Sequence, residues 1–119
     1  MKENVVVIKS FDLAIRIVNL YKYLVETKKE YVMSKQILKS GTSIGANIRE
    51  SQSAESKSDF IHKLSISLKE VRETSYWMEL LYRTDFISIE EIESIDKDIT
   101  ELKKIISSII LALPGSSQI

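Results

Sequence analysis

The sequence predicts an all-α protein, an antiparallel up-down-up-down four-helix bundle that self-associates. Apolar residues recur at alternating steps of three and four along four segments, which is the spacing of one helix face. The connections between these segments are only a few residues long, so consecutive helices are expected to lie antiparallel. A chain of 119 residues corresponds to a single domain, residues 1–119.

The first helix is expected over about residues 10–28, with Ser10 as its cap. Lys28 and Lys29 stand near its C-terminus, where cations are favourable. Residues 5–8 are strand-like in composition, but they are too few to build a sheet. Two apolar stripes run along the helix, formed by Phe11, Ala14, Val18, Tyr21 and Val25, and by Leu13, Ile17, Leu20 and Leu24.

The second helix is expected over about residues 34–52, and residues 40–50 within it are small, polar and include two glycines. Each glycine destabilises a helix interior by about 1 kcal/mol relative to alanine. Gly41 and Gly45 are four residues apart and share one face. Because that face has lost its side chains, we expect another backbone to approach it closely. The apolar stripe of this helix is Ile37, Gly41, Ile44 and Ile48.

The last two helices carry clear start signals. The third is expected over about residues 57–83, after Ser56, with Asp59 completing a capping-box-like pair. The fourth is expected over about residues 89–113, with Ser88 and Glu91 as a capping box, and Pro114-Gly115 should end it before a loose tail. Their stripes are Phe60, Leu64, Ser67, Val71, Thr74, Met78 and Leu81, and Ile92, Ile95, Ile99, Leu102, Ile106, Ile109 and Leu113.

The small-residue run on the second helix needs a packing partner. A turn centred near residue 55 places Ser40 and Gly41 level with Glu70 of the third helix. Two interpretations stay open: Glu70 and Glu73 are both solvated, or hydroxyls and a carboxylate form a polar layer that fixes helix register. For Tyr76 and Trp77, packing in the core or between subunits is favoured over stacking on bases. The residues predicted for helix packing or assembly are Ser40, Gly41, Ser43, Gly45, Asn47, Glu70, Glu73, Tyr76 and Trp77.

The chain has more apolar stripes than one bundle can bury. The first helix has two, and wide exposed stripes usually mark a partner surface. We therefore expect a homo-oligomer. Further apolar residues lie outside the main stripes of the third and fourth helices, at Ile61, Ile66, Leu68, Tyr76, Trp77, Leu80, Ile105 and Ile110.

The net charge is zero, but it is unevenly distributed. Residues 1–50 carry nine basic and five acidic side chains, whereas residues 85–119 carry three basic and seven acidic ones. These are either solvated helix faces or complementary surfaces that meet between subunits. A nucleic-acid-binding domain normally has a basic excess, which this chain lacks.

The residue types exclude several classes of site. The chain has no cysteine, which excludes disulfides and thiolate zinc sites. His62 is the single histidine, so the paired Glu-x-x-His motifs of a di-metal bundle are missing, and we expect His62 to be solvated. The carboxylate pairs Glu70/Glu73 and Glu93/Asp96 have no base or metal partner. Neither a signal peptide nor a transmembrane helix is evident, so we expect a cytoplasmic, non-enzymatic protein with no cofactor, metal or small-molecule substrate.

One set of motifs spans about residues 9–112: Phe11-Asp12-Leu13, the Leu38–Ile48 run, Ala54, Ser56, Asp59-Phe60, Lys63–Ile66, Lys69-Glu70, Arg72-Glu73-Thr74 and Tyr76-Trp77. These motifs carry a resemblance to the four-helix-bundle proteins encoded in bacterial 23S rRNA intervening sequences. It implies a homopentameric ring. The accessory variability determinants of diversity-generating retroelements are similar in fold and bind nucleic acid and a reverse transcriptase through a basic surface. This chain departs from them in having zero net charge.

These observations favour an oligomeric binding or scaffolding module. The alternative is an RNA-associated protein that binds through its basic N-terminal half, with weak and electrostatic affinity. A bundle enzyme is a second and less favoured alternative. The residues predicted for nucleic-acid contact are Lys22, Lys28, Lys29, Lys35 and Lys39.

Overall fold

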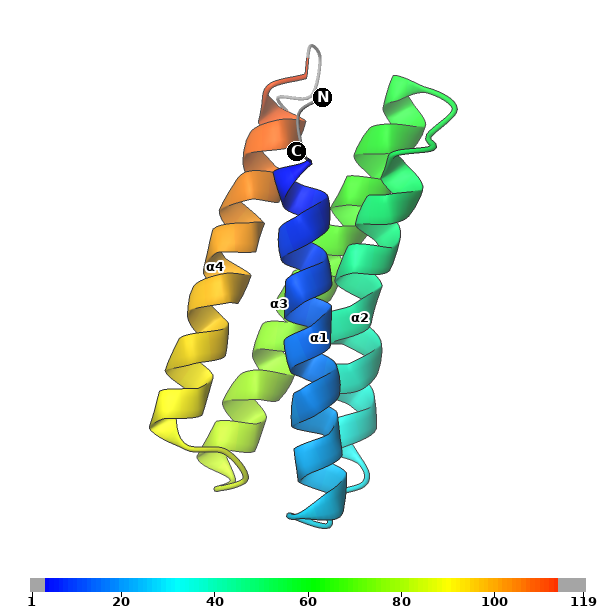
Figure 1. The fold of residues 1–119 in the computed structure, drawn as a ribbon. Helices are drawn as coiled ribbons and strands as arrows, with labels where there is room; N and C mark the ends of the chain where they lie inside the picture. The colour runs from blue at the N-terminus through cyan, green and yellow to red at the C-terminus, as the bar shows by residue number, and fades with distance from the viewer. Residues whose placement is uncertain (1–3, 114–119) are drawn as a thin grey trace.

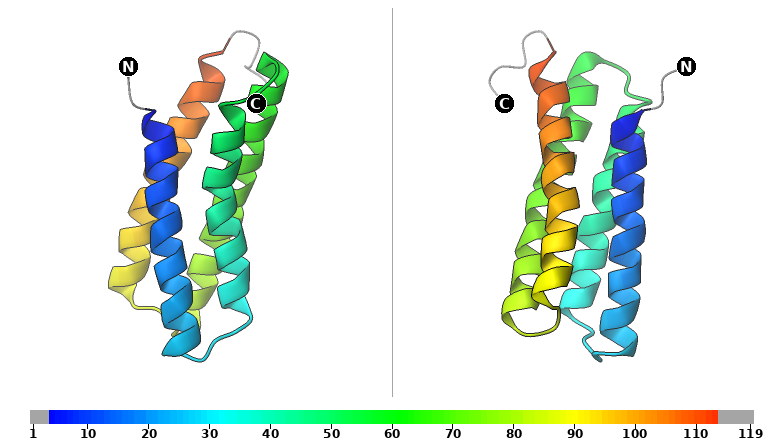
Figure 2. Two further views of the ribbon diagram at one scale, coloured as in Figure 1. Left: turned by 45° about the vertical axis from the view of Figure 1, so that its right-hand side comes forward. Right: turned by 60° about the vertical axis from the view of Figure 1, so that its left-hand side comes forward.

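Four helices form an elongated bundle of 46 × 24 × 23 Å (Figures 1 and 2). The computed structural model describes residues 4–113. Its helices are α1 (Val5–Glu26), α2 (Met33–Ser51), α3 (Lys57–Arg83) and α4 (Ile89–Leu111). Each helix packs against its neighbours in sequence, and α4 closes the bundle against α1, whereas the backbones of the diagonal pairs stay farther apart. The predicted all-α four-helix architecture is thereby confirmed.

The core contains most of the stripes expected from the sequence, and it also contains Leu68 and Ile110, which were wrongly placed outside them. The other exception is on α1. On that helix the stripe Leu13, Ile17, Leu20 and Leu24 is buried. The other α1 stripe stays partly in solvent, because its Phe11 side chain is exposed and Ala14 and Val18 are only half-buried. The core residues of α2, α3 and α4 include Ile37, Ile44, Ile48, Leu64, Leu68, Val71, Met78, Leu81, Ile95, Ile99, Leu102, Ile106 and Ile110.

The start of α1 was placed wrongly at residue 10. The helix begins at Val5, and Asn4 is its cap, accepting a hydrogen bond from the Val7 main-chain N–H at 3.4 Å. Ser10 is buried inside the helix, where its hydroxyl donates to the Val7 carbonyl. β-Branched residues have a weak helix preference, but burial of Val6 against the core overrides it.

The capping box of α4 forms as expected, whereas that of α3 forms only in half, because the Asp59 carboxylate accepts from the Glu55 N–H (3.2 Å) and not from the N–H of Ser56. Ser56 accepts from the Asp59 N–H at 3.0 Å, and α3 begins at the next residue, Lys57. Ser88 and Glu91 form a reciprocal capping box at the start of α4. The helix ends at Leu111, two residues before the predicted end, and the predicted stop and tail at residues 114–119 lie outside the described residues.

The N-terminus of α2 is closed by Glu30, a role that no sequence signal indicated. Its carboxylate accepts hydrogen bonds from the main-chain N–H groups of Val32 (3.1 Å), Met33 (3.0 Å) and Ser34 (2.7 Å). These groups have no partner within the helix itself. Glu30 is nearly buried and so fixes the α1–α2 connection to the start of α2.

Candidate assembly surface on α1, α2 and α3

The two glycines of α2 face α1. A Cβ atom added to Gly41 would lie 2.8 Å from Cγ1 and from Cγ2 of Ile17. A Cβ atom added to Gly45 would lie 3.3 Å from the main-chain oxygen of Ser10. The missing side chains therefore let α1 and α2 approach closely along this side.

An apolar groove of about 460 Å³ opens outward between α1 and α2. Phe11 and Ile15 line the groove and are 49% and 47% exposed, which is high for large apolar residues. Ile8, which is 42% exposed, continues the same stripe along α1. We call this feature the α1–α2 groove. Its apolar lining is Phe11, Ala14, Ile15, Val18, Gly45 and Ala46, and its polar lining is Asn19, Thr42 and Arg49.

Arg49 supplies the positive charge at this groove. Its guanidinium carbon lies 4.8 Å from the centre of the Phe11 ring, which is within the range of a cation–π contact. Lys22 and Lys39 follow at helical spacing from the lining residues Val18 and Thr42. The groove is thus apolar with basic residues around it.

Hydroxyl groups join α2 to α3. The Thr74 hydroxyl donates to the Ser40 hydroxyl oxygen at 3.0 Å, and the Ser67 hydroxyl donates to the main-chain oxygen of Ile44 at 2.8 Å. Ser40, Ser67 and Thr74 are fully buried. These bonds connect one position on each helix to one position on the other, so they fix the register of the pair.

The sequence-based register of α2 against α3 was wrong by about one helical turn. Ser40 lies level with Thr74 and not with Glu70, whose main-chain oxygen lies 2.8 Å from the Thr74 hydroxyl. The layer consists of hydroxyls and main-chain oxygens and does not include the predicted carboxylate. Ser56 is extended, with φ −157° and ψ 167°, so the α2–α3 connection is not the symmetric turn that the estimate assumed.

The remaining polar side chains of the α2 run bond to their own helix. The hydroxyl of Thr42 donates to Leu38 O (2.7 Å) and that of Ser43 donates to Lys39 O (2.6 Å). The Asn47 amide donates to Ser43 O at 2.9 Å. Ser43 and Asn47 are half-buried, and within residues 4–113 neither side chain forms a hydrogen bond to α3.

A second surface lies on α3 beside α2. Lys63 belongs to this side of α3, because its ammonium pairs with Glu50 of α2 at 3.0 Å. This hydrogen bond and the charge of Glu50 raise the pKa of Lys63 above its ordinary value. Successive positions at helical spacing then form what we call the α3 stripe: Ile66, Glu70, Glu73, Trp77 and Leu80.

The α3 stripe combines half-buried apolar side chains with two carboxylates. The Trp77 indole N–H donates to Glu73 at 3.4 Å, and the exposed Tyr76 ring packs edge-on against Trp77, with ring centres 4.9 Å apart. Trp77 also packs against the core. Within residues 4–113, neither Glu70 nor Glu73 forms a salt bridge.

Most of the lysines predicted for nucleic-acid contact gather at one end of the bundle. Lys28 and Lys29 lie in the α1–α2 connection, and Lys35 lies in the first turn of α2. Tyr31, which is 52% exposed, lies in the same connection. We call Lys28, Lys29, Tyr31 and Lys35 the basic tip; Lys22 and Lys39 lie farther along α1 and α2.

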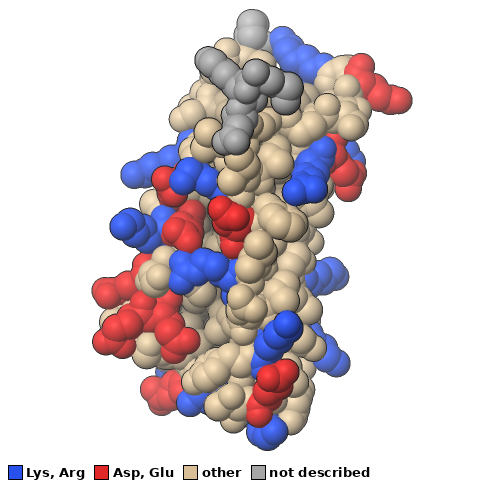
Figure 3. Space-filling model, viewed as in Figure 1, with Lys and Arg blue, Asp and Glu red and all other residues tan. Residues whose placement is uncertain are grey.

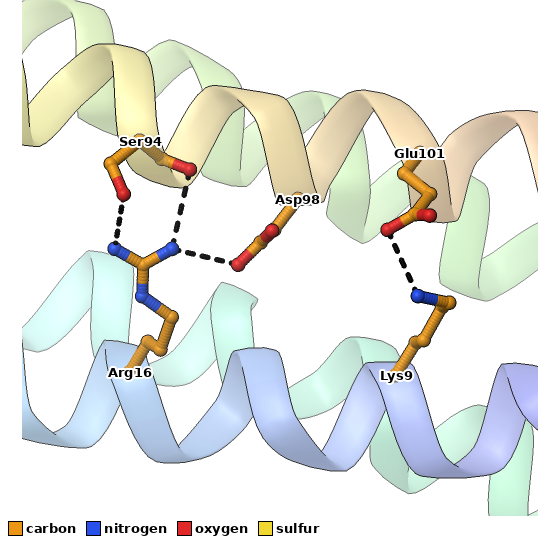
Figure 4. A network of polar contacts seen from close by, with 5 residues as sticks. All are labelled: Lys9, Arg16, Ser94, Asp98 and Glu101. Carbon is orange, nitrogen blue, oxygen red and sulfur yellow. Dashed lines mark hydrogen bonds and ion pairs between the residues drawn. The ribbon is translucent and has the colours of Figure 1, made fainter.

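A polar seam joins α1 to α4 (Figure 4). Arg16 donates to Asp98 (2.7 Å), to the Ser94 hydroxyl (2.8 Å) and to the Ser94 main-chain oxygen (3.2 Å). Lys9 pairs with Glu101 at 3.1 Å. Basic α1 and acidic α4 therefore meet within one subunit, and acidic side chains gather over the N-terminal half of α4 (Figure 3).

No group of three or more metal-ligating side chains comes together within residues 4–113. His62 is exposed on α3. Among the same residues, no helix is long and apolar enough to cross a membrane.

Sequence reasoning found part of the α1–α2 groove and missed the rest. Phe11, Ala14 and Val18 were recognised as a second apolar stripe, and Gly45 as a close-approach position. Ile15, Ala46 and Arg49 were not selected. The signal for Ile15 is that Ile8, Phe11 and Ile15 share one face of α1. This signal marks an exposed stripe only once it is known which side of α1 faces the core.

Comparison with known proteins places the chain in a family. The model of the 23S rRNA-intervening sequence protein family matches residues 2–108. A crystal structure of a protein with unknown function from the S23 ribosomal protein family of Bacteroides thetaiotaomicron is 62% identical, with a TM-score of 0.88. The match covers 89% of this chain and 98% of that one, whereas no curated protein matches. The chain therefore belongs to the 23S rRNA-intervening sequence protein family.

Proposed function

We propose that this protein is a non-enzymatic, self-assembling module that acts as an oligomeric scaffold or binding platform. The observation that carries the proposal is the α1–α2 groove, where Phe11 and Ile15 remain about half exposed. Large contiguous apolar surfaces on soluble proteins usually mark interaction sites. The family resemblance supports a ring of five subunits.

Light scattering coupled to size-exclusion chromatography tests this proposal. At micromolar concentration we expect the mass of several chains in one sharp peak. A uniform peak with the mass of one chain would reject self-assembly, and with it the scaffold role.

A second candidate function, association with RNA, is favoured by the basic tip. Tyr31 is exposed next to lysines, and an exposed aromatic ring among cations can stack on an unpaired base. A ring would repeat this tip, so that weak contacts add up through avidity. The zero net charge of the chain argues for weak, salt-sensitive binding.

A further inference from the structure

We infer that subunits assemble head to tail, with the α1–α2 groove of one copy covering the α3 stripe of the next. This inference rests on the proposed self-assembly and names its two surfaces. The occupant of the groove is therefore a second copy of this chain, bound through a surface different from the groove itself.

The first argument is that the two surfaces differ in chemistry and complement each other. The groove is apolar and carries Arg49, with Lys22 and Lys39 nearby. The α3 stripe is partly apolar and carries Glu70 and Glu73. Within residues 4–113, none of these five charged side chains forms a salt bridge, so each is available to a partner subunit.

The second argument is that a like-with-like contact would be unfavourable. In a two-fold dimer through the groove, the basic side chains around one groove would approach those of the other, because such an interface uses the same patch twice. A two-fold dimer through the α3 stripe would likewise bring Glu70 and Glu73 toward the partner's carboxylates. Contact between groove and stripe avoids both repulsions.

The third argument concerns closure. In a four-cornered bundle the α1–α2 and α2–α3 sides are adjacent, so the two docking directions are about 90° apart. In a closed head-to-tail ring, the directions from one subunit to its two neighbours are about 90° apart for four copies and about 108° apart for five. Adjacent sides therefore close a small ring and do not propagate as a straight filament. In this arrangement α2 faces the ring axis and α4 faces outward.

The interior of the ring then follows from the sequence of α2. Lys39 lies on the exposed side of this helix, opposite Ile37 and Ile44 in the core, at the edge where the groove meets the inner surface. Each copy thus contributes lysine to the inner surface. The acidic outer face of α4 stays in solvent, where it does not repel the neighbouring subunit.

Mixing variants tests the head-to-tail contact. Ala46→Glu adds bulk at the groove and a negative charge that repels the carboxylates of the α3 stripe, and it leaves the stripe of its own chain intact. Glu70→Lys with Glu73→Lys reverses the stripe and leaves the groove intact. Each variant alone should run with the mass of one chain. Mixed in equal amounts, they should associate, because one undamaged groove and one undamaged stripe remain.

Matched controls separate this contact from general effects on folding. Ala46→Lys adds similar bulk with a charge that suits the stripe, so it should retain more oligomer than Ala46→Glu. Thr100→Glu on exposed α4 should assemble normally. Circular dichroism should show the same helix content in all variants. If a groove variant has lost helix, Arg49→Glu replaces it; if the stripe variant has lost helix, Leu80→Glu replaces it.

The outcomes are distinguishable. A monomeric wild type would reject the proposed function together with this inference. An oligomeric wild type whose groove and stripe variants still assemble would overturn only the inference. Two monomeric variants that do not combine would show that the groove does not bind the α3 stripe, which also overturns it.

Discussion

Gly41 of α2 lies directly against Ile17 of α1. A single added Cβ at position 41 would come within 2.8 Å of two Ile17 side-chain carbons, a distance that packed atoms do not adopt. Ile17 is itself completely buried. The close packing of α1 on α2 therefore depends on the pairing of the smallest residue with a β-branched one.

This pairing predicts a change of sign in a double-mutant cycle. Gly41→Ala should destabilise the wild type, because overpacking typically costs about 1–3 kcal/mol. In an Ile17→Ala background both γ-carbons are gone and only the Cβ of residue 17 remains, 3.1 Å away, a contact that a small backbone shift relieves. Gly41→Ala should then stabilise by up to about 1 kcal/mol through helix propensity. Urea denaturation at one protein concentration measures both effects. Equal effects in the two backgrounds would show that Ile17 does not restrict position 41.

Gly45 predicts a graded response to side-chain size. The Cβ of Gly45→Ala would lie 3.3 Å from Ser10 O, which a small backbone shift relieves, so its effect on stability should be small. Gly45→Leu adds atoms beyond that point and should lower the free energy of unfolding by about 1–3 kcal/mol, more than its propensity gain. Thermal unfolding of the two variants side by side is the measurement. A Gly45→Leu protein that is more stable and assembles normally contradicts the close approach.

The buried Thr74–Ser40 pair predicts strong non-additivity. Thr74→Val leaves Ser40 with only its 3.5 Å contact to Ile37 O, and an unsatisfied buried hydroxyl costs about 1–3 kcal/mol. Adding Ser40→Ala removes the orphaned group, so the double variant should be about as stable as Thr74→Val or more stable. Denaturation of the single and double variants gives the coupling energy. Additive losses would mean that the two hydroxyls act independently.

Glu30 predicts local loosening at the start of α2. Glu30→Ala removes three charge-assisted hydrogen bonds to main-chain N–H groups, and we expect a loss of about 1–3 kcal/mol. Amide hydrogen exchange should quicken first at Met33 and Ser34. The matched control is Glu26→Ala, on the exposed surface of α1. Similar exchange rates in both variants would argue against the capping role.

The basic tip predicts weak and unspecific binding to RNA. At roughly 150 mM salt, fluorescence anisotropy should show no discrimination between a short RNA and its scrambled control. Any affinity should fall steeply with salt: the slope of log affinity against log salt concentration should be close to −1 for each duplex phosphate neutralised. Lys28→Glu with Lys35→Glu should reduce it, whereas Lys103→Glu with Lys104→Glu on α4 should not. Nanomolar, sequence-selective binding would favour the RNA-associated function over the scaffold.

Local signals predicted the parts of the fold that they determine. The α3 boundaries were predicted correctly because Ser56 caps the residues that directly follow it, and the same holds for Ser88 at α4. The start of α1 was missed because the β-branched residues Val5–Ile8 resemble a strand, although Asn4 caps the helix locally and Val6 is buried in the core. The groove was missed in part for another reason. Which side of α1 stays in solvent depends on where Gly41 and Gly45 dock, and no local pattern specifies that.

The hydroxyls that α2 bonds to its own carbonyls change how that helix behaves toward a partner. Thr42 and Ser43 look hydrophilic in sequence, yet each hydroxyl proton already has an acceptor four residues back. A molecule that covers this helix need not supply hydrogen-bond acceptors for those two hydroxyls, so removing water from them costs little free energy. Only the hydroxyl oxygens, which can still accept, lose water when this face is covered. A neighbour can therefore contact the face while Thr42 and Ser43 keep the hydrogen bonds that they form in the single chain.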